Sequence, residues 1–231
     1  MPLGLMFEDE AGRLCAILLA QENVSPVLNL GSSSRAFREQ AKPHIDAGLF
    51  RPLREAGIEV VHSDLKAADG VDIPGDVLDP AIQAKLRGIG FKCVLLANML
   101  EHVADRKAVI AACEEIVGAG GLILATVPSS YPYHADPIDS GFRPSPTELA
   151  AAFTRSQPLL AEELIERTFA DVIAERGSSL RREAVRTMLW CLVFPLRPKS
   201  ARARLDRWRW LRKPYRVSVA LVAVGDAVRR S

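Results

Sequence analysis

The sequence predicts an α/β fold built around a mostly parallel sheet. Short apolar runs alternate with helical patterns over residues 26–128, which is typical of βαβ units. Two of these runs, residues 93–97 and 122–127, are almost wholly apolar, as expected for central strands buried on both faces. A length of 231 residues, 48% of them hydrophobic, with a net charge of +2 suits one globular domain and excludes collagen-like and disordered chains.

Strands are predicted where an apolar run stops at a turn. The first, residues 27–30, stops at Gly31, and the second, residues 58–61, stops just before Asp64. We expect Pro128 to end the strand over residues 122–127, because proline has no backbone N–H to donate. The other predicted strands are residues 71–73, 93–97 and the valine-rich residues 217–224.

Helices are predicted from apolar spacing and capping residues. Residues 46–56 have one apolar face, and Gly57 is placed to end that helix. Asp105 can cap a helix, and Ser145–Glu148 forms a capping-box pattern that starts a helix at its proline. Apolar spacing predicts two more helices, over residues 180–192 and 201–211.

The cysteines and the first residues predict a cytoplasmic protein. The four cysteines have no zinc-binding spacing and are expected to be reduced. The first 25 residues lack a basic region and carry Glu8, Asp9 and Glu10, so we expect no signal peptide. The longest uncharged apolar run, Thr187–Leu196, is half of the roughly 20 residues that cross a bilayer.

Small or polar residues follow the predicted strands in four loops, residues 29–35, 62–66, 98–102 and 129–143. Ligands of open parallel sheets bind beyond the carboxyl ends of the strands, so these loops predict a ligand site; the alternative is four ordinary surface loops. Gly31 allows a ligand to approach the backbone closely. Asp64 can accept both hydroxyls of a ribose, whereas Asp76 is either a turn residue or an acceptor for an exocyclic amine.

The chain resembles the S-adenosylmethionine-dependent methyltransferases of the Rossmann-like class over about residues 24–153. The segments that carry the resemblance are Val27–Ser32, Asp64, Gly75–Val77, Asn98–Val103 and Gly120–Leu122. Within them, Leu100–Val103 reads LEHV and resembles a subgroup of methyltransferase-domain proteins.

The resemblance implies a three-layer Rossmann-like sandwich formed by one domain, residues 1–231. Its mostly parallel seven-stranded sheet would have an antiparallel last strand, residues 217–224, and a basic helical insertion at residues 176–216. The strand before the insertion should lie within residues 158–170, although residues 159–167 alone favour a helix.

The resemblance also implies S-adenosyl-L-methionine as the cofactor. Gly31 and Ser32 would contact its methionine part, Asp64 would hold the ribose, and Asp76 with its neighbour would hold the adenine. Asn98 would lie beneath the sulfonium end. The implied cofactor-binding residues are Asn29, Gly31, Ser32, Ser33, Asp64, Asp76, Val77 and Asn98.

The sequence departs from the family pattern in two places. Asn29 replaces the usual acidic residue, and the glycine-rich turn reads Gly31-Ser32-Ser33-Ser34-Arg35. Asparagine can still accept a hydrogen bond, and serines fit where the backbone needs no positive φ. With these changes, a family member that binds the cofactor without catalytic turnover remains an open alternative. The long gap between the first two strands leaves room for an extra segment, residues 44–54, over the cofactor.

One loop concentrates candidate catalytic groups. His134 is the leading candidate for a general base, with Asp136 or Asp139 to orient it; the alternative is a loop held by its prolines. We interpret His102 as structural. Arg143 either binds an anionic substrate or pairs with one of the two aspartates. No spacing indicates a metal site.

Residues 176–216 are strongly basic. They carry 13 Lys and Arg residues against two acidic residues, and they hold all three tryptophans. One interpretation is a pair of surface helices that pack on the sheet or cap the site. A second is a peripheral contact with the inner membrane surface, which would favour a lipid-linked glycan as acceptor. Nucleic-acid binding is disfavoured because no base-reading motif accompanies the charge.

The sequence therefore predicts a methyltransferase that acts on an oxygen of a small or glycan-like acceptor. A catalytically degenerate binding or scaffold protein is the first alternative. A nicotinamide-dependent oxidoreductase is the second, and it is disfavoured because the chain lacks GxGxxG.

Overall fold

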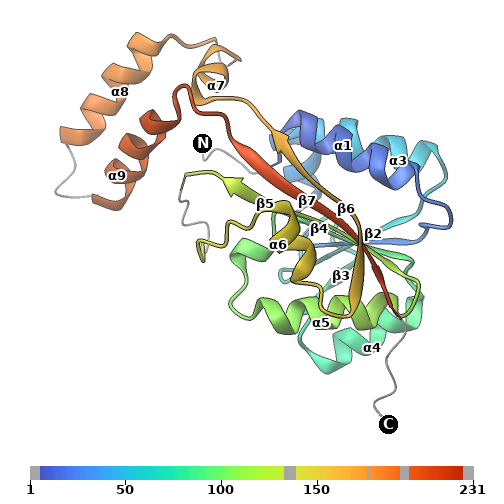
Figure 1. The fold of residues 1–231 in the computed structure, drawn as a ribbon. Coiled ribbons are helices and arrows are strands. Elements are labelled where there is room, and N and C mark those ends of the chain that lie inside the picture. The colour runs from blue at the N-terminus through green and yellow to red at the C-terminus, as the bar shows by residue number, and fades with distance from the viewer. Residues whose placement is uncertain (1–5, 133–138, 176, 193–197, 226–231) are drawn as a thin grey trace.

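A computed structural model describes residues 6–132, 139–175, 177–192 and 198–225. Seven strands form one sheet in the order β3-β2-β1-β4-β5-β7-β6 (Figure 1). Strand β7 is antiparallel to both of its neighbours, and the other pairs are parallel. The predicted mostly parallel sheet with an antiparallel last strand is confirmed. The strands are β1 (Val27–Leu30), β2 (Val60–Asp64), β3 (Ile73–Pro74), β4 (Cys93–Ala97), β5 (Leu122–Ser130), β6 (Ser156–Ile165) and β7 (Arg216–Val224).

Helices cover both faces of the sheet and complete three layers (Figure 1). The side chains of alternate residues in the central strands belong to two separate hydrophobic cores. Leu28 and Val94 face one core, whereas Val27 and Leu95 face the other. The first core is covered by α4 (Pro80–Ile89), α5 (Arg106–Val117) and α6 (Pro146–Ala151). The second is covered by α1 (Glu8–Leu19), η1 (Phe37–Ala41), α2 (Pro43–Ile45), η2 (Asp46–Phe50) and α3 (Arg51–Glu55).

The capping residues act as the sequence predicts. The Asp105 side chain accepts a hydrogen bond from the Ala108 amide at the start of α5. At α6, Ser145 and Glu148 form a reciprocal capping box. Each cap satisfies backbone donors that the first turn of a helix leaves unpaired.

The structure corrects the end of one predicted strand. Strand β5 continues through Pro128 to Ser130, with a register shift between these two residues, so the expected stop at Pro128 is wrong. The strand that the resemblance implies before the insertion is present as β6 despite the local helical preference of this segment, because pairing with β7 outweighs propensity. The segment 44–54 packs against α1, with Leu49 and Leu53 fully buried.

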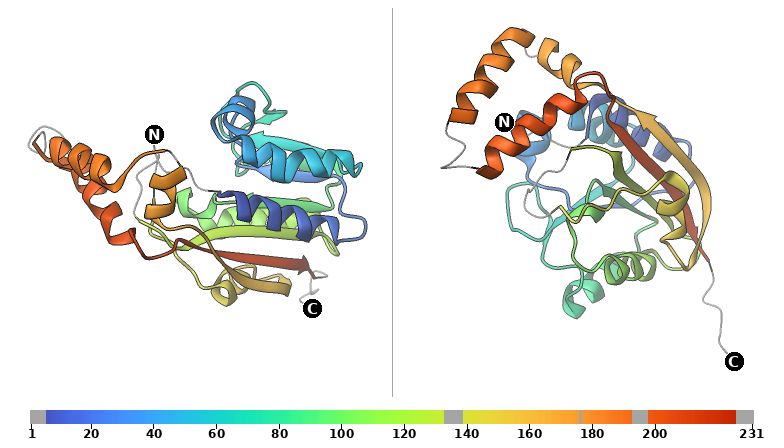
Figure 2. Two further views of the ribbon diagram at one scale, coloured as in Figure 1. Left: turned by 90° about the horizontal axis from the view of Figure 1, so that it is seen from above. Right: turned by 60° about the vertical axis from the view of Figure 1, so that its left-hand side comes forward.

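The chain leaves the sheet after β6 and returns at β7, and a helical insertion lies between them. It comprises α7 (Phe169–Glu175), α8 (Leu180–Leu192), α9 (Pro198–Asp206) and η4 (Arg207–Trp210). Residues Ile165 and Arg216 are paired, and Arg216 also pairs with Ser130 at the end of β5. The insertion therefore emerges at the carboxyl edge of the parallel strands, and α8 and α9 project from the body (Figure 2). Within the described ranges, every helix is too short or too polar to cross a bilayer.

Two glycine substitutions test the packing of α5 on the sheet. A Cβ at Gly121 would overlap the Val117 side chain and lie 2.8 Å from the Val117 carbonyl oxygen. We expect Gly121→Ala to lower the free energy of unfolding by about 1–3 kcal/mol. Gly88→Ala is the matched control, since no atom lies within 4 Å of a Cβ there, and it should raise the same quantity by up to about 1 kcal/mol. Chemical denaturation measures both, and equal effects would contradict the packing.

Candidate functional site

The turn after β1 lies beside the ends of β2 and β3. The Gly31 amide donates a 2.8 Å hydrogen bond to the Ser63 carbonyl, and the Gly75 amide donates a 2.9 Å bond to the Asp64 carbonyl. Gly31 has φ +78°, and a Cβ there would lie 3.0 Å from Met99 Cγ. Both the left-handed backbone and the close contact with Met99 therefore favour glycine.

Asp64 connects the end of β2 to the turn after β1. Its Oδ2 accepts a 2.8 Å hydrogen bond from the Ser33 amide, and its Oδ1 accepts a 3.2 Å bond from the Lys66 amide. Because a carboxylate has about four lone-pair positions, Asp64 can still accept ligand hydroxyls. Asp76, after β3, is exposed, and its Oδ1 accepts a bond from the Leu78 amide.

The serine-rich turn adopts a left-handed backbone conformation that is usually found at glycine. Ser33 has φ +55°, so the expectation that serines fit here without positive φ is wrong. Its amide is held by Asp64, and its carbonyl accepts a 2.7 Å bond from Arg38 Nη1. These two bonds offset the strain of a left-handed non-glycine residue.

Arg38 is a positioning residue that the sequence analysis missed. Its buried guanidinium donates hydrogen bonds to the carbonyl oxygens of Ser32, Ser33 and Gly70. It thereby ties the turn after β1 to the loop that precedes β3. Burial lowers the pKa of Arg38, although an arginine keeps its charge in proteins. No local pattern marks this arginine, because its partners are backbone carbonyl oxygens, and one of them, that of Gly70, lies 32 positions away.

Asn29, which replaces the usual acidic residue, is turned toward the neighbouring strand. Its Nδ2 lies 3.0 Å from Nδ1 of His62, and the Asn29 side chain is buried. Burial and nearby arginines lower the pKa of His62 to about 4. The imidazole is therefore neutral at physiological pH, and its Nδ1 can accept the amide proton.

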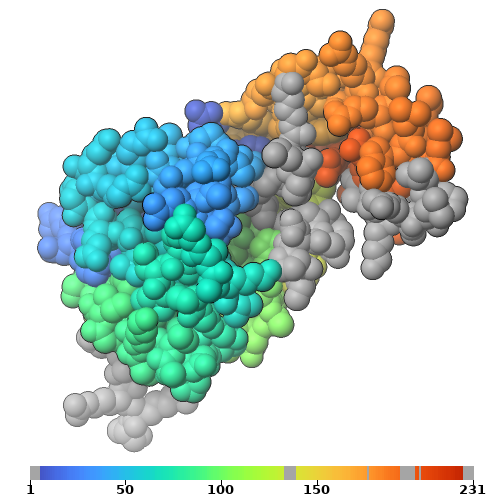
Figure 3. Space-filling view, turned by 180° about the vertical axis from the view of Figure 1, so that it is seen from behind, coloured from blue at the N-terminus to red at the C-terminus, as the bar shows by residue number. Residues whose placement is uncertain are grey.

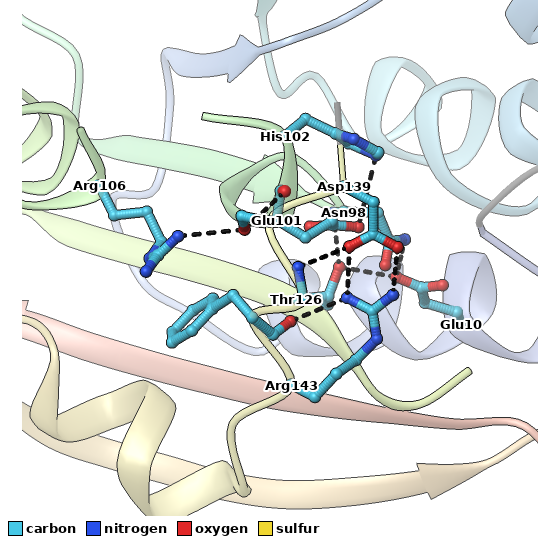
Figure 4. Close-up of polar contacts among 11 residues, drawn as sticks. Glu10, Asn98, Glu101, His102, Arg106, Thr126, Asp139 and Arg143 are labelled. Atoms are coloured by element: carbon cyan, nitrogen blue, oxygen red, sulfur yellow. Dashed lines mark hydrogen bonds and ion pairs between the residues drawn. The ribbon is translucent and has the colours of Figure 1, made fainter. Parts of the chain in front are cut away.

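A buried carboxyl group from α1 lies at the end of β4 and against the middle of β5. Glu10 Oε1 accepts a 2.7 Å hydrogen bond from Asn98 Nδ2 and another of 2.7 Å from Thr126 Oγ1 (Figure 4). The side chain of Asn98 thus points to Glu10, and its backbone has φ +49°. Burial raises the pKa of Glu10 to about 7, against the opposing effect of these two hydrogen bonds.

Two more carboxyl groups are buried near Glu10. No other described residue donates a hydrogen bond to the carboxyl oxygens of Glu101, and His102 Nε2 lies 3.7 Å from one of them. Burial raises the pKa of Glu101 to about 8. The pKa of Glu166, which follows β6, is raised to about 7 by burial and by the charges of Glu10 and Asp9.

Of the three predicted catalytic residues, the structure describes one. Asp139 is buried and receives two hydrogen bonds from Arg143, at 2.6 and 3.1 Å (Figure 4). Arg143 therefore pairs with an aspartate, one of its two predicted roles. His134 and Asp136 lie outside the described residues. Where the structure describes the chain, no three acidic, histidine or cysteine side chains are grouped to hold a metal ion.

Comparisons with known proteins identify the fold. No family model and no curated protein matches the chain. Among solved structures, the [4+2]-cyclase SpnF matches 95% of this chain over 83% of its own, with 13% identity and a TM-score of 0.54. A candidate methyltransferase from Bacillus halodurans matches 95% over 100% of its own chain, with 11% identity and a TM-score of 0.55.

A third solved structure, coclaurine N-methyltransferase bound to N-methylheliamine and S-adenosylhomocysteine, matches 93% of this chain over 70% of its own. The two share 12% identity, with a TM-score of 0.53. Identities this low show the fold alone. The chain has the Rossmann-like fold typical of methyltransferases, with the strand order and antiparallel β7 described above.

The buried carboxyl groups predict a stability that falls as pH rises. The folded-state pKa values of about 7 for Glu10, 8 for Glu101 and 7 for Glu166 lie above their ordinary value of 4.5. Between pH 4.5 and 8 the folded state thus holds more protons than the unfolded state, so the free energy of unfolding decreases over this range. Denaturation at pH 5 and pH 8 measures the decrease.

Glu10→Gln should flatten this pH dependence, because an amide keeps the acceptor for Asn98 and Thr126 without a titrating proton. A shift from 4.5 to about 7 corresponds to on the order of 3 kcal/mol at pH 8. Glu22→Gln, at an exposed position, is the control and should leave the pH dependence unchanged. An equal slope in wild type and Glu10→Gln would show that Glu10 titrates normally.

Proposed function

We propose that this protein is an S-adenosylmethionine-dependent methyltransferase. One observation carries the proposal: Gly31, Asp64 and Asp76 stand at the carboxyl ends of three adjacent strands, β1, β2 and β3. Open α/β sheets bind nucleoside ligands at this edge. The resemblance noted in the sequence and the typical methyltransferase fold support the same function.

The residues at this edge suit the cofactor. Asp64 has free lone pairs for the ribose hydroxyls, and exposed Asp76 with buried Val77 offers a polar and an apolar contact for the adenine. Gly31 is exposed and has no side chain, so a ligand could approach its backbone closely. The cofactor supplies a methyl group on a positively charged sulfur. The buried carboxyl groups near β4 and β5 would favour that positive charge.

The acceptor in this proposal is an oxygen of a small or glycan-like molecule. Methylation of a hydroxyl needs a proton acceptor. Glu10 suits that role because its pKa of about 7 lies near the operating pH, where general bases are most effective. Its hydrogen bond to Asn98 also places it next to the residue that the resemblance assigns to the sulfonium end. Glu10 therefore joins His134 as a candidate base.

The alternative is a protein that binds the cofactor without turnover. It is favoured by Asn29, whose side chain engages His62 where the family usually has an acidic residue. A cyclase is also among the proteins that share this fold. Tight binding with no methyl transfer to any acceptor would support this alternative over the enzyme.

A substitution of Asp64 tests the cofactor site through a binding measurement that does not depend on catalysis. We expect Asp64→Ala to weaken the affinity for S-adenosylhomocysteine at least about tenfold, because the loss of two hydroxyl contacts to a charged group costs more than 1.4 kcal/mol. Asp69→Ala removes an exposed carboxylate nearby and should change the affinity less than twofold. Isothermal calorimetry measures both, and unchanged binding in Asp64→Ala would contradict the assigned site.

Glu10 tests the proton acceptor. With a panel of hydroxyl-bearing saccharides, Glu10→Gln should lower kcat about 100-fold and leave the affinity for S-adenosylhomocysteine within twofold. Glu114→Gln is the control, because Glu114 is a buried carboxyl that bonds Arg155 and Ser156 on the far edge of the sheet. Release of S-adenosylhomocysteine measures the rate. A full rate in Glu10→Gln would assign the base to another residue.

A further inference from the structure

Helix α8 turns four apolar side chains away from the rest of the protein. Val185, Met188, Leu189 and Leu192 follow the spacing i, i+3, i+4, i+7, which places them on one face. Their side chains are 52%, 63%, 54% and 73% exposed. We call these four residues the outward face of α8. A surface helix normally buries such a stripe, so this face lacks a partner among the described residues.

The opposite side of α8 provides its contacts with the protein. Thr187 is buried, and its Oγ1 accepts a 3.1 Å hydrogen bond from Trp208 Nε1. Trp190 is half-buried, with the Arg204 guanidinium 5.3 Å from its ring centre. Thr187 and Trp190 lie about 160° and 140° around the helix from Val185 at 100° per residue. The outward face therefore points into solvent because the helix is already packed through its other side.

Two basic side chains extend the outward face toward the start of α8. Arg181 and Arg182 precede Val185 by four and three residues, so they extend the same face toward the start of the helix. Both are exposed, as are Arg202, Arg209, Arg212 and Lys213 elsewhere in the insertion. The two acidic side chains of residues 176–216 are already paired, Glu183 with Arg186 and Asp206 with Arg209. An apolar stripe beside exposed arginines in a strongly basic segment matches the headgroup layer of an anionic bilayer.

We propose that the outward face of α8 docks on an anionic phospholipid bilayer. The apolar side chains enter the acyl boundary, and the long arginine side chains extend to the lipid phosphates. A second copy of this chain fits the surface less well, because a symmetric contact would bring the same positive charges together. The orange part of the insertion stands out from the rest of the molecule (Figure 3), and the four apolar side chains of the outward face are exposed.

The proposed contact would bring the candidate site close to the membrane. The insertion leaves and re-enters the sheet at the pair Ile165 and Arg216, level with the end of β5. The candidate site lies at the same edge of the sheet as the root of the insertion. Membrane binding does not require methyl transfer, and its test is independent of the proposed function.

Vesicle cosedimentation of the full chain tests the contact. We expect the protein to sediment with vesicles of phosphatidylglycerol and phosphatidylcholine at 1:1 and not with phosphatidylcholine alone, and 0.5 M salt should reduce the bound fraction. Leu189→Ser/Leu192→Ser should lower the partition coefficient at least about tenfold. Arg181→Gln/Arg182→Gln should lower it about fivefold for each arginine.

Matched variants on α4 and in the loop that follows it provide the controls. Ile89 is 42% exposed, and Lys85 and Lys92 are exposed, so Ile89→Ser and Lys85→Gln/Lys92→Gln should bind as wild type does. Circular dichroism checks that all variants are folded. The proposal is overturned by an absence of binding to anionic vesicles at low salt, or by equal binding of Leu189→Ser/Leu192→Ser. Self-association in sedimentation velocity that this variant abolishes, without vesicle binding, would instead assign the face to a second copy.

Discussion

The central strands of this sheet are buried on both faces, and this constraint decides where polar chemistry can lie. Val27, Leu28, Val94 and Leu95 are fully buried between helical layers, so ionisable side chains along these strands would have to lose their hydration. The parallel strands all end at one edge of the sheet, and there the chain passes into loops. The polar groups of the candidate site consequently gather at that edge.

Burial also divides the charges at this edge into two kinds. The charge of Asp139 is paired with Arg143 through a bidentate contact. This contact offsets the free-energy cost of burying the carboxylate. Glu10 and Glu101 have no such partner among the described residues, and their raised pKa values mean that protonation takes the place of a counterion. A positive charge brought next to them would favour their ionised forms. The edge is therefore suited to a cationic ligand, as the proposed cofactor is.

The fold was more predictable from the sequence than the site. Strands such as 93–97 are continuous apolar runs, and α5 and α6 carry explicit caps, so local patterns suffice. Helix α4 was missed although Asp79 caps it and Gly90 ends it, while α1 has no side-chain cap. Glu10 and Arg38 were missed because their roles arise from contacts across 88, 116 and 32 positions of sequence. The left-handed backbone of Ser33 depends on the same kind of distant contact.

The antiparallel direction of β7 connects the insertion to the site. A parallel last strand would have required the chain to cross to the other edge of the sheet, whereas β7 begins at the edge where β6 ends. Tyr215, fully buried just before β7, stacks on Phe7 ahead of α1 and contacts Tyr131 after β5. This aromatic cluster fixes the root of the insertion to the same segments that carry Glu10 and the end of β5. The contacts that hold the root of the insertion are therefore shared with the segment that leads into α1, which carries Glu10.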